Sequence, residues 1–119
     1  MKGSSRRPEQ VAENIRQVVA EALTREIRDP RIGLVTLTSV TVTADLSHAK
    51  IRVSTQGDED TKLRALEGLR SASGFLRTRV AKALTTRTVP ELHFELDRGL
   101  EHAARINEVL ESLKQEEQD

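Results

Sequence analysis

The sequence predicts a single α+β domain over residues 1–119, in which helices cover one face of a three-stranded sheet. A chain of 119 residues has the length of one domain. Two stretches with alternating apolar residues follow an initial helical pattern, and a third such stretch comes after a second helical pattern. Two consecutive strands form an antiparallel hairpin, and a strand that follows a helical crossover returns to the same sheet.

The first helix is expected to begin after a serine N-cap and to end near Arg28. Ser4 or Ser5 is available as its N-cap, and Pro8 falls in the first turn, where its missing N–H costs little. Pro30 disfavours helical geometry in the residue before it, which sets the end of the helix. Apolar residues recur at helical spacing in this stretch: Val11, Ile15, Val18, Ala22, Leu23 and Ile27.

Two strands follow the first helix. The stretch LVTLTSVTVT alternates, but its apolar residues change phase between Leu37 and Val40. This slip, near Thr38 and Ser39, indicates a β-bulge. Basic and apolar side chains alternate over residues 50–53, which predicts a strand with one solvent-exposed face.

The second half predicts an interrupted helix, a strand and a final helix. The interruption is the Ser-Ala-Ser-Gly segment 71–74, because serine and glycine are poor residues for a helix interior. The stretch VPELHFELD alternates and begins a strand after Pro90, and a final amphipathic helix is expected over 100–113. Residues 1–7 and 114–119 are expected to be flexible ends. The apolar stripe of the interrupted helix comprises Leu63, Leu66, Leu69, Leu76, Val80 and Leu84.

Charge is distributed unevenly along a chain whose net charge is zero. Residues 61–88 contain seven basic side chains and one acidic, whereas residues 89–119 contain three basic and nine acidic. The first segment is suited to a polyanion. Phe75 and Phe94 are the two aromatic residues, so any RNA contact must depend on backbone and charge rather than on base stacking. No cysteine, signal sequence or membrane span is found, which favours a cytoplasmic protein.

Enzymatic function is not predicted. His48, His93 and His102 lack the close sequence pairing of a metal site, and no cysteine assists them. The chain contains no phosphate-binding loop, nucleotide fingerprint or nucleophile elbow. We therefore expect no catalytic residue, no metal and no cofactor.

Four separated segments resemble a known family. DPRIG at 29–33, DLSHAK at 45–50, ASG at 72–74 and PELHF at 90–94 occur in this order, and the whole chain is similar to bacterial ribosome-binding factor A. The element order is that of a type II K-homology domain. The resemblance implies a non-catalytic factor that binds the immature small (30S) ribosomal subunit through its 16S rRNA, assists 5′-end processing and supports growth in the cold. We expect a monomer with no small-molecule substrate.

The helix interruption is the predicted RNA site. Single-strand-binding K-homology domains contain a Gly-x-x-Gly loop, and Ala72-Ser73-Gly74 stands in its place here, as in the family. We expect a positive φ at Gly74, a serine cap on the second helix, and free amides there that face a phosphate. The predicted RNA-binding residues are Arg6, Arg7, Arg70, Ser71, Ser73, Gly74, Arg77, Arg79, Lys82 and Arg87.

Each of these assignments has an alternative. Gly74 also fits close helix packing or a simple bend. A basic helix face is commonly just solvated, although a single acidic residue in 61–88 leaves few partners for ion pairs. Arg6 and Arg7 fit either a solubilising tail or an arm on RNA. The alternative function is a protein-interaction module that docks through its acidic C-terminal helix.

Overall fold

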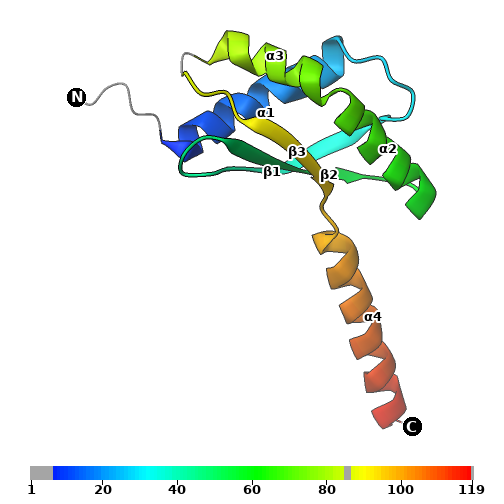
Figure 1. Cartoon of the computed structure of the whole chain (residues 1–119). Helices are drawn as coiled ribbons and strands as arrows, with labels where there is room; N and C mark the ends of the chain where they lie inside the picture. Colours follow the sequence, from blue (N-terminus) through cyan, green and yellow to red (C-terminus); the bar gives the residue numbers. More distant parts are fainter. Residues whose placement is uncertain (1–6, 85–86, 119) are drawn as a thin grey trace.

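The computed structural model describes residues 7–84 and 87–118 and shows an α+β fold with a mixed three-stranded sheet (Figure 1). Arg6, one of the predicted site residues, lies outside the described residues. Within the described ranges the elements are α1 (Pro8–Arg25), β1 (Val35–Val42), β2 (His48–Thr55), α2 (Glu59–Ser71), α3 (Ser73–Ala83), β3 (Glu91–Leu96) and α4 (Gly99–Gln118).

The strand order is β1-β2-β3, with β1 and β2 antiparallel and β2 and β3 parallel. The predicted bulge is confirmed, because the β1–β2 register shifts between Leu37 and Ser39. The alternation of buried and exposed residues along β2 and β3 is confirmed as well. Ile51, Val53 and Phe94 are buried, whereas the residue before each of them in its strand is exposed.

Helices α1, α2 and α3 cover one face of the sheet, and the other face is open (Figure 1). The core lies between these two layers, and no polar or charged residue among those described is buried in it. The largest fully buried side chains are Ile15, Ile51, Leu69, Leu76, Val11, Val19, Val53, Val80 and Pro90.

Helix α1 is shorter than expected at both ends. Its N-cap is Arg7 rather than a serine, and the Arg7 side chain makes no capping hydrogen bond. The helix ends at Arg25 rather than near Arg28. The carboxylate of Asp29 accepts hydrogen bonds from the backbone and the guanidinium of Arg31. These bonds lower the pKa of Asp29, and the bond from the Arg31 side chain has the largest effect. The same bonds build a turn that takes the chain away from the helix axis.

The interrupted helix is two helices, with Ala72 between them. Ala72 has φ −86° and ψ −3°, and its N–H donates to carbonyls at the end of α2. Gly74 lies inside α3, and the described glycines with positive φ are Gly33 and Gly57. The expected positive φ at Gly74 is therefore wrong, because a single bridging residue near helical geometry already separates the two helices.

Gly68 is the glycine whose size matters for packing. A Cβ added there would lie 2.9 Å from Cγ1 of Ile32 and 3.3 Å from a carboxylate oxygen of Asp29. Helix α2 therefore approaches the turn after α1 so closely that a methyl group does not fit. This contact connects the end of α1 to the middle of α2.

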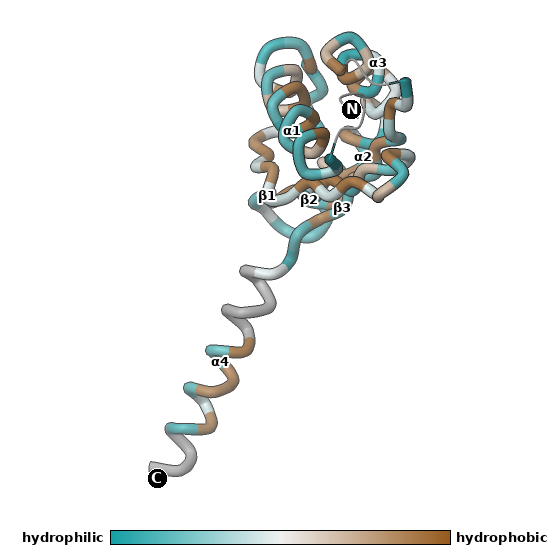
Figure 2. The backbone as a smooth tube through the Cα atoms, turned by 90° about the vertical axis from the view of Figure 1, so that its left-hand side faces the viewer, coloured by the Kyte–Doolittle hydropathy of each residue, from teal (hydrophilic) through white to brown (hydrophobic). Residues whose placement is uncertain are grey.

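Helix α4 projects away from the rest of the domain (Figure 1). The apolar side chains of its described part are about half exposed. In Figure 2 the hydrophobic positions appear as brown segments of the backbone tube along the helix. Leu63, expected in the core stripe, is likewise 48% exposed. No described helix is both long and apolar enough to cross a membrane. The exposed large apolar residues in the described part of α4 are Ile106, Val109, Leu110 and Leu113.

Two glycine substitutions should have opposite effects on stability. Gly68→Ala should lower the free energy of unfolding by about 1–3 kcal/mol, because the new methyl group overlaps Ile32. Gly74→Ala should raise it by up to about 1 kcal/mol, because Gly74 is helical and open space surrounds the added methyl group. Urea unfolding of both variants measures the difference, and a destabilised Gly74→Ala would contradict the helical geometry described.

Candidate nucleic-acid interface

Two arginines reach from the helices to the chain around β3. Arg70 of α2 donates from Nη2 to the carbonyl of Phe94 at 3.4 Å, and Arg77 of α3 donates from Nη2 to the carbonyl of Val89 at 2.8 Å. Both side chains are largely exposed. A carbonyl partner fixes a guanidinium in place without cancelling its charge, so both remain able to attract phosphate.

Lys82 is an exposed cation near the end of α3, and Arg87 is an exposed cation in the segment that joins α3 to β3. Neither forms an ion pair with a described residue. We call Arg70, Arg77, Lys82 and Arg87 the basic surface. Exposed cations of this kind suit contact with a nucleic-acid backbone.

Arg79 differs from the other predicted cations. Its guanidinium forms an ion pair with Glu26, with Nε 2.9 Å from Oε1, and lies 5.6 Å from the centre of the Phe75 ring. The side chain is half-buried, so the expectation that it is solvated and unpaired is wrong. Glu26 follows α1, far from the basic segment in sequence, and a charge count within 61–88 misses it.

The start of α3 differs from the expected serine-capped terminus. Its N-cap is Ala72, which makes no side-chain cap bond, and the hydroxyl of Ser73 donates to the carbonyl of Arg70 at 2.8 Å. Ser71 is exposed at the end of α2, and Gly74 is exposed in the first turn of α3. That first turn contains no acidic residue, so its positive dipole end is not compensated locally.

Arg7 is exposed at the start of α1. Helix α1 packs on β1 and α3. The assignment of Arg7 to RNA binding stays a prediction.

The open face of the sheet contains a histidine pair that sequence reasoning missed. Nδ1 of His48 lies 3.0 Å from Nε2 of His93, and Glu91 is adjacent to both. His48 is the first residue of β2 and is paired with Glu91 in the parallel register. Only strand pairing across 45 residues of sequence brings the two rings together.

The turn before β2 is held by one carboxylate. Asp45 accepts hydrogen bonds from the hydroxyls of Ser47 and Thr43 and from the backbone N–H of Ser47. These bonds lower the pKa of Asp45 to about 2, and the bond from the Ser47 hydroxyl has the largest effect. Thr43 in turn accepts from the N–H of His48, so the turn positions the first residue of β2.

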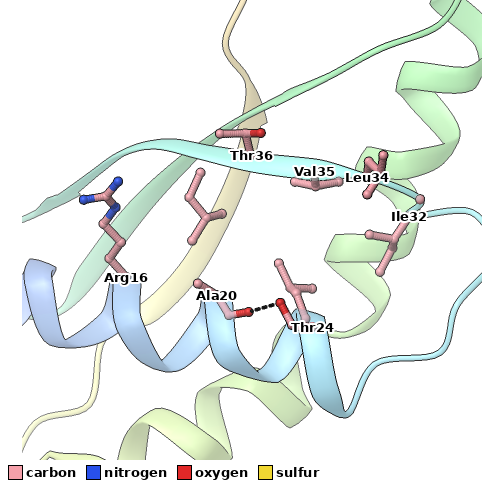
Figure 3. Close-up of a pocket in the computed structure, with 10 residues that line it drawn as sticks. Arg16, Ala20, Thr24, Ile32, Leu34, Val35 and Thr36 are labelled. Carbon is pink, nitrogen blue, oxygen red and sulfur yellow. Dashed lines mark hydrogen bonds between the residues drawn. The ribbon is translucent and has the colours of Figure 1, made fainter.

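A hollow of about 460 Å³ lies between α1 and β1 (Figure 3). Arg16 and Thr24 line it from the helix, and Val35 and Thr36 line it from the strand. Arg16 is the one titratable side chain among the described residues around it. Without an acid–base pair or a nucleophile beside a base, this hollow does not have the composition of an active site.

Sequence comparison identifies one family. A family model described as "Ribosome-binding factor A" matches residues 7–110. A ribosome-binding factor A from Rhodopirellula baltica is 45% identical over 115 residues, which cover 97% of this chain and 84% of that relative. One from Thermomicrobium roseum is 46% identical over 114 residues, covering 96% of this chain and 88% of that relative.

Solved structures agree with this result. The solution structure of a candidate ribosome-binding factor A from Thermotoga maritima matches with a TM-score of 0.69 and 33% identity, covering 76% of this chain and 87% of that one. The crystal structure of the Thermus thermophilus factor matches with a TM-score of 0.67 and 25% identity, covering 77% and 97%. A homology model of the Thermus factor, fitted into a cryo-EM map of its complex with the 30S subunit, matches with a TM-score of 0.58 and 26% identity, covering 72% and 90%.

The turn at Asp45 should make domain stability depend on pH. Because folding lowers the pKa of Asp45 from 3.8 to about 2, the ionised form stabilises the native state fully above about pH 4, and this contribution is lost as the pH falls toward 2. Asp45→Asn should therefore lower the thermal midpoint at neutral pH and match the wild type near pH 2. Thermal melts across this range check it, with Glu21→Gln, at an exposed position of α1, as the control.

Proposed function

Because this chain belongs to the ribosome-binding factor A family, we propose that it binds the small ribosomal subunit through its 16S rRNA and acts in subunit maturation. The family consists of assembly factors rather than enzymes. The observation that supports binding most directly is the complex of the Thermus thermophilus relative with the 30S subunit. The fold shared with that relative provides a scaffold for the same contact.

In this proposal the basic surface contacts RNA phosphates. Lys82 and Arg87 are exposed and free of ion pairs with described residues, while Arg70 and Arg77 are held in place by backbone carbonyls. Such contacts fix position without reading sequence. The start of α3, at Ser73 and Gly74, contributes uncapped amides, and Arg6 and Arg7 are assigned further phosphate contacts.

The finer features of the proposal follow the family resemblance. The domain is of the type II K-homology kind, and the Ala72-Ser73-Gly74 junction replaces the phosphate-clamping Gly-x-x-Gly loop. The chain acts as a monomer in the cytoplasm, late in 16S rRNA maturation and at its 5′ end, including during growth in the cold. The helix break at Ala72 and the positive surface beside it support this assignment.

The alternative is a protein-interaction module that docks through α4. The observation that favours it is the half-exposed apolar stripe of α4, formed by Ile106, Val109, Leu110 and Leu113. The segment 89–119 also has nine acidic residues against three basic, so a basic protein groove would complement it.

Charge reversal on the basic surface tests the proposed function. Lys82→Glu with Arg87→Glu should weaken co-sedimentation with small subunits about tenfold or more, because each lost phosphate contact also adds a repulsive charge. The matched control reverses Arg16 and Arg25, two exposed arginines of α1. It changes the net charge equally and should reduce binding much less.

Nuclease digestion separates the two functions. Circular dichroism first establishes that both double variants are folded, and binding is then measured at roughly 50 and 200 mM salt, where phosphate contacts weaken steeply. Retention of the chain on its partner after RNA digestion would favour docking through α4. Equal binding by the two double variants would remove the basic surface from the interface.

A further inference from the structure

The open face of the sheet gathers three metal-ligating side chains at one end. His48 lies at the start of β2, opposite Glu91 in the parallel register, and His93 follows two residues later on β3. All three are exposed, and one ligand atom from each lies within 4.8 Å of the others. They face away from the helices, because their neighbours along the strands, Ala49 and Leu92, are buried in the core.

We propose that His48, Glu91 and His93 bind a divalent transition-metal ion of the zinc type. Zinc binds imidazole nitrogen at about 2.0–2.1 Å, so two nitrogens at a tetrahedral angle around it are about 3.3 Å apart. Nδ1 of His48 and Nε2 of His93 are already 3.0 Å apart. The distance between the two nitrogens therefore needs to change by only a few tenths of an ångström, and the rings must tilt so that both nitrogens point at the ion.

The same two atoms share a hydrogen in the metal-free protein. A neutral imidazole has one N–H and one acceptor nitrogen, so one ring donates to the other at 3.0 Å. When the metal binds, the donating ring shifts its hydrogen to its other nitrogen, and both facing nitrogens become ligands. The exposed carboxylate of Glu91 completes a set of two nitrogens and one oxygen by rotating its side chain toward them.

The neighbouring charges leave this site available. Lys50 and Arg52 lie on the same face, but both pair with Glu95, at 3.9 Å and 3.2 Å, rather than with Glu91. A hollow beside the pair is lined by both histidines, which gives an ion access from solvent. Three protein ligands leave a fourth coordination position for water or an anionic oxygen.

The donor set selects the class of ion. Imidazole suits zinc, nickel, cobalt and copper, whereas magnesium and calcium prefer oxygen ligands throughout. The site is therefore expected to take Zn²⁺ and to leave millimolar Mg²⁺ unbound. This inference does not rest on ribosome binding, since it follows from the ligand geometry alone.

Zinc titration of the full chain tests the site. The protein is prepared without a histidine tag and treated with a chelator, and ZnCl₂ is titrated by calorimetry near pH 7.5. We expect one equivalent to bind with a dissociation constant of the order of micromolar. His93→Ala should weaken binding about tenfold or more, since losing even an outer hydrogen-bond partner of a metal ligand costs roughly 10–100-fold. Glu91→Gln should weaken it less.

The control variant is His102→Ala, which removes the third histidine of the sequence from α4. It should bind zinc as the wild type does, and circular dichroism should show that all variants are folded. No saturable zinc binding, or binding that His93→Ala leaves unchanged, would overturn the proposal, as would equal displacement of zinc by Mg²⁺.

Discussion

β2 and β3 pair in parallel, in a register that places His48 opposite Glu91 and Val53 opposite Leu96. A parallel pair cannot be joined by a tight turn, so the chain between these strands must cross over the sheet, and α2 and α3 make this crossover. The apolar faces of α2 and α3 then meet the same side of the sheet as α1, and the core forms there. The opposite side is left open to solvent.

This pairing also determines which polar groups meet. Because α2 and α3 lie over β3, Arg70 and Arg77 reach backbone carbonyls in β3 and in the segment before it. On the other face the same register brings two histidines and a glutamate together. The domain therefore presents arginines held by backbone carbonyls on the crossover side, and a cluster of two histidines and a glutamate on the open side.

Sequence reasoning predicted the features that depend on neighbouring residues. The burial of Ile51 and Phe94 follows from alternation within a strand, and the β1 bulge near Ser39 follows from a change of phase. Pairs that depend on distant residues were not predictable: His48 meets His93 across 45 positions, and Arg79 meets Glu26 across 53. The weak helix formers at 71–74 indicated a break, but not that Ala72 would make it without a left-handed glycine.

Charge counted along the sequence overstates the charge available at the surface. Residues 61–88 have seven cations, but Arg64 pairs with Asp60 and Arg79 with Glu26, so each would have to break an ion pair to meet a phosphate. Arg77 is in a different position, because its carbonyl partner holds the guanidinium without neutralising it. An unneutralised arginine whose side chain is already held in place loses less conformational entropy when it binds a phosphate. The arginines bound to carbonyls are therefore better suited to an RNA backbone than those in ion pairs.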